Sequence, residues 1–396
     1  MESEPPSCGQ GGYLFSPVRT IATAGTPPGW AGPLVEVERW EWRAGDAGDP
    51  VSELTAFLTT HGLAGEPAGQ TGGTAVALLA GAVGAALIAG VPPGRPSPVP
   101  AVPELAAVAY RPGAGDPVPA PGPAVVGEWS LSWTDQEHAA AVESVRQAIA
   151  RGELYQANVV GHRSAPHHSD PQEVAAAVAR LPGALYGGVI AGAGWAVGCA
   201  SPEQLVRVTG SRVTTVPIKG TIPVLPGSRE TLLASAKDRA EHVMIVDLER
   251  NDLSRVAEVG TVEVEGLYEL MDWSGLWQAS STVAARLAPG ATTLDVLRAL
   301  LPGGSVTGAP KRAACALLAG LEPVGRGPAM GALGLLWPGG MDLGLTIRTI
   351  GADQDRVHLW AGGGITWSSD PRAEVDEAHA KAGPILATLR GRRAAL

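Results

Sequence analysis

The sequence predicts an α+β protein, because its strands and helices come in blocks and do not alternate strictly along the chain. Residues 185–199 and 205–216 are β-type runs with no helix between them, and Gly210 lies where a hairpin turn would fall. A long stretch of helical spacing follows at residues 229–255. We therefore expect large antiparallel sheets, and the 396 residues leave room for two subdomains or one composite domain.

The N-terminal part carries no motif that indicates function. Within residues 1–90, the uncharged run 74–90 predicts a buried strand or helix, since it is short for a membrane span and rich in glycine and alanine. Prolines crowd into residues 91–123, which predicts an extended connector on the surface. We expect a divergent N-terminal segment at residues 1–124 and a second domain at residues 125–396.

Local signals are clearer in the second domain. Thr134 and Glu137 form a capping box that opens a helix, and Gly152 ends it. The remaining predictions are strands near residues 154–160, 331–337 and 344–350, and helices at residues 293–300, at 310–321 and from Pro371 onward.

Composition excludes several classes of function. The formal net charge of -10 leaves no basic stripe for nucleic acid. Cys8, Cys199 and Cys315 show no C-x-x-C spacing, so neither a disulfide framework nor a thiolate metal site is indicated. No apolar segment follows the acidic first residues, so we expect no secretory signal, no membrane association and a cytoplasmic location.

Lys219 is the first candidate nucleophile. It lies in the run PIKGT, residues 217–221, between a β-type segment and the helical stretch, which predicts a glycine-flanked turn. Lysine acts as a nucleophile or base only where burial or a neighbouring cation lowers its pKa. A buried turn would provide that burial, and a solvated loop lysine is the alternative that this motif alone leaves open.

Two helical segments each carry a pair of carboxylates at i and i+3, hence on one face. Asp238 and Glu241 form the first pair, and Glu374 and Glu377 form the second. Together they could hold a hard divalent cation such as Mg2+. Either pair alone is typical of a solvated helix face.

Three further features suit an anionic substrate. The glycine-rich loop at residues 302–310 runs into a helix start, where exposed N–H groups bind anions, but it lacks the Walker pattern and so excludes nucleotide. The glycines at residues 362–364 could offer N–H groups to a carboxylate or form a plain turn. Arg348 ends an apolar strand and needs a substrate carboxylate or a structural acid as partner. Glu203 lies at a strand end, where catalytic acids are often found. A glutamate there can also simply cap the end of the strand.

Seven segments, taken in order, resemble one known family: GELYQANVV, SPEQL, PIKGT, KDRAEHVMIVDLERNDLSRV, PGGSVTGAPK, GLTIRT and AGGGITWSSDPRAEVDEAHAKA. The family is the chorismate-utilising enzymes, which include component I of anthranilate synthase and of aminodeoxychorismate synthase, and the isochorismate and salicylate synthases. The resemblance covers about residues 129–389. It implies the anthranilate synthase component I-like composite fold, with two layered α/β halves and the active site between them. It also implies that residues 125–396 form a chorismate-binding catalytic domain with Mg2+ as cofactor.

The resemblance implies roles for individual residues. Aminodeoxychorismate synthases resemble PIKGT and use this lysine to attack ring carbon 2, whereas anthranilate-forming members resemble PIAGT. Lys219, Glu203 as general acid and Thr221 are then the catalytic residues. Gln156 stands where the isochorismate and salicylate enzymes carry a lysine base, which argues against activation of water. The implied metal ligands are Glu241, Glu377, Glu374 and Asp238. The implied substrate-binding residues are Arg348, Gly363, Gly364, Thr307 and Gln156.

Three departures leave the product open. Gln278 replaces a histidine usual in the family, Ala329 replaces an aromatic residue, and Val224 replaces an arginine. The leading hypothesis is aminodeoxychorismate synthase component I, which makes 4-amino-4-deoxychorismate for p-aminobenzoate and folate or for a specialised metabolite. Ammonia would come from a separate glutamine amidotransferase subunit or from free ammonium. The alternatives are an anthranilate or aminodeoxyisochorismate synthase component I, with Lys219 a spectator, and an inactive homologue that binds a glutaminase.

Overall fold

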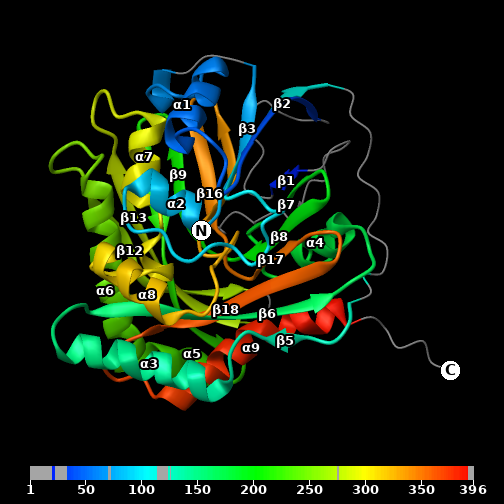
Figure 1. Ribbon diagram of the computed structural model, residues 1–396. Helices are drawn as coiled ribbons and strands as arrows, with labels where there is room; N and C mark the ends of the chain where they lie inside the picture. Colours follow the sequence, from blue (N-terminus) through cyan, green and yellow to red (C-terminus); the bar gives the residue numbers. More distant parts are fainter. Residues whose placement is uncertain are drawn as a thin grey trace.

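The computed structural model describes residues 20–22, 34–69, 73–113, 124, 126–273 and 276–390. Two antiparallel sheets form the centre of the molecule, and helices cover their outer faces (Figure 1). The largest hydrophobic cluster joins side chains of both sheets, including Val160 and Trp195 from one and Val206 and Leu343 from the other. The predicted α+β class with large antiparallel sheets is confirmed.

Among the described residues the first sheet has eight strands. Their order is β1 (Thr20–Ala22), β7 (Tyr186–Gly192), β8 (Trp195–Ser201), β17 (Thr349–Ala352), β18 (Arg356–Ile365), β6 (Gln156–Pro166) and β14 (Gly308–Ala309), and β5 (Ser130–Leu131) pairs with β6.

The second sheet has ten strands in the described part of the chain. Their order is β11 (Ile218–Pro223), β13 (Leu276–Arg286), β10 (Arg212–Val216), β9 (Gln204–Thr209), β16 (Gly340–Leu345), β15 (Ala332–Trp337), β3 (Ala75–Ala80), β4 (Leu105–Pro112) and β2 (Leu34–Trp42), and β12 (Glu263–Trp273) pairs with β13.

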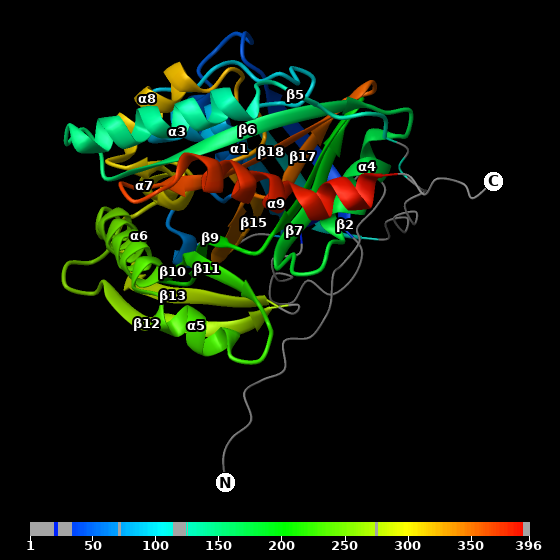
Figure 2. The same cartoon turned by 90° about the horizontal axis from the view of Figure 1, so that it is seen from below.

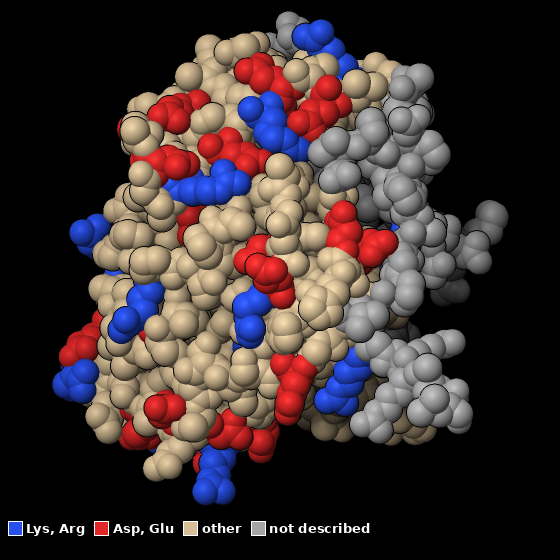
Figure 3. Space-filling view, turned by 45° about the vertical axis from the view of Figure 1, so that its right-hand side comes forward, with Lys and Arg blue, Asp and Glu red and all other residues tan. Residues whose placement is uncertain are grey.

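The described helices are α1 (Pro50–Thr60), α2 (Ala82–Ala89), α3 (Asp135–Ala150), α4 (Pro171–Ala179), α5 (Ser228–Ala234), α6 (Ala236–Ser254), α7 (Thr293–Leu300), α8 (Lys311–Leu321) and α9 (Pro371–Leu389), with short 3-10 turns η1 (Pro67–Gly69) and η2 (Gly304–Val306). Figure 2 shows α3 and α9 side by side along β6 and β18, and α5 and α6 beside β11 to β13. None of the described helices combines the length and the apolar character needed to cross a membrane. On the face in Figure 3, described Lys and Arg side chains are interspersed with Asp and Glu.

Several predicted elements need correction. The helical stretch 229–255 is two helices, because Ser235 takes an extended conformation between α5 and α6. The run 344–350 contributes to two strands of different sheets, β16 and β17. Within the proline-rich range 91–123, β4 is an interior strand between β2 and β3, so this part is not a surface connector. Its continuous apolar run is what a strand buried on both faces requires.

The N-terminal segment shares a sheet with the rest of the chain. β3 pairs with β15 along residues 76–80, and β4 and β2 extend the same sheet outward. The run 74–90, expected to be a buried strand or helix, contains both, namely β3 and α2. The proposed boundary at residues 124 and 125 stays a prediction.

Candidate active site

Lys219 lies on a strand and not in a turn. It belongs to β11 and pairs with Ala279 of β13, and the register shifts between Lys219 and Thr221, where Gly220 has φ of 71°. The side chain is partly buried. Burial and the positive charge of Lys381 lower the pKa of Lys219, while Glu203, Glu241 and Glu377 act in the opposite direction. The amine therefore loses its proton more readily than a free lysine does.

Two side-chain nitrogens lie close to Gly364. A Cβ placed on Gly364 would lie 2.8 Å from Nε2 of Gln156 and 3.3 Å from Nζ of Lys219. Gln156 is 1% exposed, and its Nε2 has no hydrogen-bond partner among the described residues. A buried donor without a partner is costly, so the Gln156 amide suits an acceptor oxygen of a ligand.

The carboxyl of Glu203 favours its protonated form. Glu203 lies between β8 and β9, is 6% exposed, and donates its backbone N–H to the hydroxyl of Ser201. Burial raises the pKa of Glu203, against the influence of Lys219, the Ser305 hydroxyl and the Ile218 N–H. A buried carboxyl whose pKa is raised holds its proton more readily, which suits general acid catalysis.

Arg348 lies near enough to Glu203 for the charge of that carboxyl to act on it. It connects β16 to β17 with φ of 50°, a strained value for a residue other than glycine. Its guanidinium makes no hydrogen bond or ion pair with a described residue, and burial lowers its pKa while the charge of Glu203 raises it. These features suit a substrate carboxylate as its partner. Thr307, by contrast, is buried and donates its hydroxyl to the carbonyl of Gly303 at 2.8 Å.

Two of the predicted metal carboxylates, Glu374 and Glu377, lie beside the glycine-rich strand β18. The Cβ position of Gly363 is 3.0 Å from Oε2 of Glu374 and 3.7 Å from Oε1 of Glu377, both on α9. Glu241 reaches the site from α6, where its charge acts on Lys219. The glycines at residues 362–364 are part of β18 and do not form a turn. The side chains of Thr221 and Asp238 lie outside the described residues.

These carboxylates fit Mg2+ by their chemistry. Within the described part of the chain no group of three or more His, Cys, Asp or Glu side chains is close enough to form a metal cage. Mg2+ does not need one, because it binds through one or two carboxylates, waters and substrate oxygens. Glu374 and Glu377 are such a pair. The metal stays a prediction.

Sequence reasoning missed Lys381. Its Nζ lies 2.7 Å from Oε1 of Glu377 and donates to the carbonyl of Gly362 at 2.9 Å. This lysine therefore places a positive charge between the carboxylates of α9 and Lys219. The available signal was its i+4 spacing from Glu377, which is common on solvated helices.

A buried charge cluster behind the 302–310 loop was also missed. Glu249 is 4% exposed, and its Oε1 lies 3.5 Å from the Cβ position of Gly304. Burial and the neighbouring Asp252 raise the pKa of Glu249 to about 8. Asp252 in turn forms an ion pair with Lys311 at 2.9 Å. Glu249 of this cluster therefore packs against the loop at Gly304.

The three departures from the family pattern differ in their surroundings. Gln278 is 2% exposed, and its Oε1 has no hydrogen-bond partner among the described residues. Ala329 is fully buried, whereas Val224 is exposed. Gln278 pairs across the β11–β13 ladder with Thr221, two residues beyond Lys219. Gln278 is therefore the departure that lies on the strand paired with the strand of Lys219.

Comparison with known proteins identifies the family. Residues 96–387 match the sequence profile of the chorismate binding enzymes. The chain belongs to that family. Anthranilate synthase component 1 of Streptomyces coelicolor is 39% identical over 291 residues, which are 71% of this chain and 57% of that protein. Aminodeoxychorismate synthase component 1 of Escherichia coli is 35% identical over 269 residues, which are 66% of this chain and 59% of that protein.

A solved structure supports the fold. Anthranilate synthase component I from Streptococcus pneumoniae superposes with a TM-score of 0.75 at 24% identity, covering 95% of this chain and 94% of that one. The predicted family and its composite fold are confirmed. The curated relatives carry two different names at similar identity, and the match spans less than two thirds of their length. They establish a chorismate-binding enzyme without deciding which member it is.

Proposed function

We propose that this chain is component I of an aminodeoxychorismate synthase, which converts chorismate and ammonia to 4-amino-4-deoxychorismate and water. The observation that carries the proposal is Lys219, whose amine has a lowered pKa and lies close to Gly364 and to the unpartnered amide of Gln156. Similarity to the Escherichia coli enzyme of that name supports it.

The site residues account for a two-step displacement. The neutral amine of Lys219 attacks ring carbon 2, the ring double bonds shift, and the C4 hydroxyl leaves as water with the proton of Glu203. Ammonia then attacks C4, the double bonds shift back, and the bond between Lys219 and carbon 2 breaks. Lys219 leaves as the neutral amine, and the ammonium formed at C4 returns one proton to Glu203. The covalent step divides one difficult substitution into two easier ones.

Other groups hold the substrate. Arg348 and the backbone N–H groups of Gly363 and Gly364 would bind its carboxylates, and Gln156 would donate to an oxygen. Glu241, Glu374, Glu377 and Asp238 would hold Mg2+, which neutralises carboxylate charge when bound. We further propose that ammonia comes from a separate glutamine amidotransferase or from free ammonium, and that the product serves p-aminobenzoate formation.

The test is to incubate the protein with chorismate, Mg2+ and ammonium and to identify the product by mass spectrometry. We expect 4-amino-4-deoxychorismate, and its loss in both Lys219→Ala and Lys219→Arg, since guanidinium stays protonated. The value of kcat/KM should rise with pH through an ionisation that lies below the pKa of free lysine, because only the neutral amine of Lys219 attacks. Anthranilate or isochorismate as the main product would overturn the proposal.

A second candidate is formation of anthranilate or aminodeoxyisochorismate, which the similarity to the Streptomyces coelicolor protein favours. Lys219 would then be a spectator, and Lys219→Ala would still aminate chorismate. An inactive homologue would bind chorismate without turnover under any ammonia source, which isothermal titration distinguishes from both enzymes.

A further inference from the structure

The side-chain oxygen of Asn158 is a buried acceptor without a partner. Asn158 belongs to β6, is 7% exposed, and its Oδ1 has no hydrogen-bond partner among the described residues. Its Nδ2 donates to the backbone carbonyl of Ser305 at 3.0 Å, so the amide cannot turn over without losing that bond. A buried acceptor in this state is costly, so Oδ1 suits a hydrogen-bond donor of a bound molecule.

Asn158 faces the interior of the candidate active site. Val159 belongs to the hydrophobic cluster with side chains of α3 and α8, whereas Val160 belongs to the cluster between the two sheets. Since alternate residues of a strand face opposite ways, Asn158 shares the inner face with Val160. Asn158 lies directly opposite Gly364 in the β18–β6 ladder, and a Cβ placed on Gly364 would lie 3.3 Å from Nζ of Lys219. Asn158 of the first sheet and Lys219 of the second sheet are therefore both neighbours of Gly364.

Ser305 provides a second acceptor of the same kind next to Asn158. It lies in η2 of the glycine-rich loop, is 5% exposed, and its Oγ has no hydrogen-bond partner among the described residues. The hydroxyl is near enough to Glu203 to counteract the rise in the pKa of that carboxyl. The two free oxygens therefore lie beside the candidate general acid and the candidate nucleophile.

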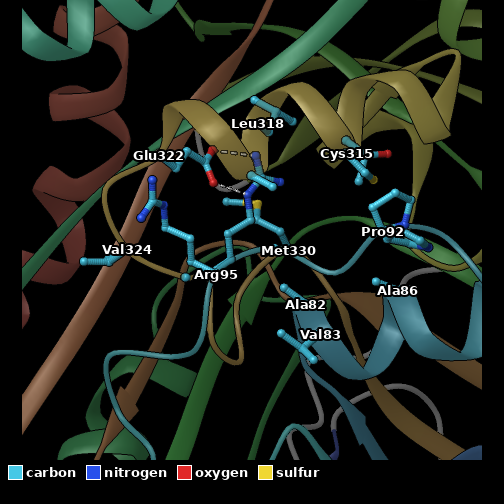
Figure 4. A pocket seen from close by; sticks show the side chains of 16 residues that line it. Ala82, Val83, Ala86, Pro92, Arg95, Cys315, Leu318, Glu322, Val324 and Met330 are labelled. Atoms are coloured by element: carbon cyan, nitrogen blue, oxygen red, sulfur yellow. Dashed lines mark hydrogen bonds and ion pairs between the residues drawn. The ribbon is translucent and has the colours of Figure 1, made fainter. Parts of the chain in front are cut away.

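A largely buried ion pair holds the backbone of both residues in place. Glu322 accepts hydrogen bonds from Arg326 at 2.8 and 2.7 Å (Figure 4). Arg326 also donates to the carbonyls of Asn158 and Val306. These contacts fix β6 relative to the loop that carries Ser305. The two acceptors are therefore positioned before a ligand binds.

We propose that Oδ1 of Asn158 and Oγ of Ser305 bind the ammonia that aminates the ring, each accepting one of its N–H groups. Chorismate offers a single hydroxyl donor, and that group leaves as water in the first step of the proposed function, on which this inference rests. Ammonia can donate to both oxygens while its lone pair stays free to form the new bond. Neither an amide oxygen nor a hydroxyl is a base that would activate water, so water bound here would stay a poor nucleophile.

The neighbourhood of Glu203 also suits the return of the proton. The bond from ammonia to C4 forms as the bond between Lys219 and carbon 2 breaks, and the nitrogen on C4 then carries one proton too many. Because the hydroxyl of Ser305 is near Glu203, a nitrogen bound to Ser305 lies close to the carboxylate that takes this proton. The same two oxygens thus position the nucleophile for attack and for the loss of its proton.

The test is the dependence of product formation on ammonium chloride at fixed pH and saturating chorismate. Ser305→Ala removes one acceptor, and Asn158→Leu removes the other at similar size. We expect each variant to raise the KM for ammonium about tenfold, as the loss of one hydrogen bond to a buried group implies. The KM for chorismate should change less than about twofold. The control is Ser164→Ala, which removes a buried hydroxyl near the other end of β6 and should leave both KM values unchanged.

An unchanged KM for ammonium in either variant would overturn the ammonia site. Ser305→Ala decides alone if circular dichroism shows that Asn158→Leu does not fold. A raised KM for chorismate with an unchanged KM for ammonium would also overturn it, because the donor would then be the chorismate hydroxyl. Anthranilate as the product, with the KM for ammonium raised in the variants, would overturn only the proposed function. No aminated product from the unmodified protein would overturn both.

Discussion

Replacing Gly364 with alanine tests whether the substrate binds next to Lys219 and Gln156. The added Cβ would lie 2.8 Å from Nε2 of Gln156 and 3.3 Å from Nζ of Lys219, both inside ordinary van der Waals contact. The backbone accepts alanine, because Gly364 does not have positive φ. Gln156 is 1% exposed and has little room to move, so we expect overpacking to cost about 1–2 kcal/mol of unfolding free energy.

Activity should suffer far more than stability. The methyl group takes the place of a substrate atom next to the nucleophile, and we expect kcat/KM for chorismate to fall at least about 100-fold, which corresponds to about 2.7 kcal/mol of transition-state stabilisation. Urea denaturation and steady-state product formation measure the two effects separately. Near wild-type kcat/KM in Gly364→Ala would show that the substrate does not bind here.

The control is Gly320→Ala on α8. A Cβ at Gly320 meets no atom within 4 Å. We expect this variant to gain about 0.5–1 kcal/mol of stability, because alanine loses less backbone entropy than glycine in a helix. Its kcat/KM should stay unchanged, which separates the effect at Gly364 from a general response to alanine.

Three other substitutions test the metal, a helix cap and the buried cluster. Glu377→Gln should abolish activity at ordinary Mg2+ and recover partly at high Mg2+; full activity in excess chelator would exclude a metal role. Thr134→Ala removes the acceptor of the Glu137 N–H at 3.2 Å and should cost about 1 kcal/mol in urea denaturation with unchanged activity; an effect of a few tenths would contradict the cap. The folded pKa of Glu249, about 8, exceeds its usual 4.5, so its contribution to stability is complete below 4.5 and is lost as pH rises through about 8. Glu249→Gln has no such proton, and its stability relative to wild type should rise between pH 5 and 9; a constant difference would contradict the burial of this carboxyl.

Local signals predicted the elements whose ends are fixed by their own side chains. α3 begins at the Thr134 capping box as expected, and α7 occupies the predicted residues 293–300. The β9–β10 hairpin has Gly210 at φ of 59° in its turn. In each case the deciding contacts join residues within a few positions, so the sequence carries the full signal.

Glycines near the site were misinterpreted, because the sequence does not show what a glycine is for. Gly220 has positive φ, but it serves a register shift inside β11 and not a turn. Gly362 is needed because a Cβ there would lie 2.0 Å from the carbonyl oxygen of Val159 on the adjacent strand. From the sequence alone, a glycine required by a turn cannot be distinguished from a glycine required by a close neighbouring atom.

The arrangement of the site depends on strand pairing between distant segments. Gly364 pairs with Asn158 in the β18–β6 ladder, which places it beside Gln156, about two hundred positions earlier in the chain. The same ladder carries Gly362, whose carbonyl accepts from Lys381 and so fixes that charge near Lys219. Burial is the largest influence that lowers the pKa of Lys219, and Lys381 is the next. Lys381 is on α9 and far from β11 in the chain, so the fold itself shifts Lys219 toward the neutral amine before any substrate is bound.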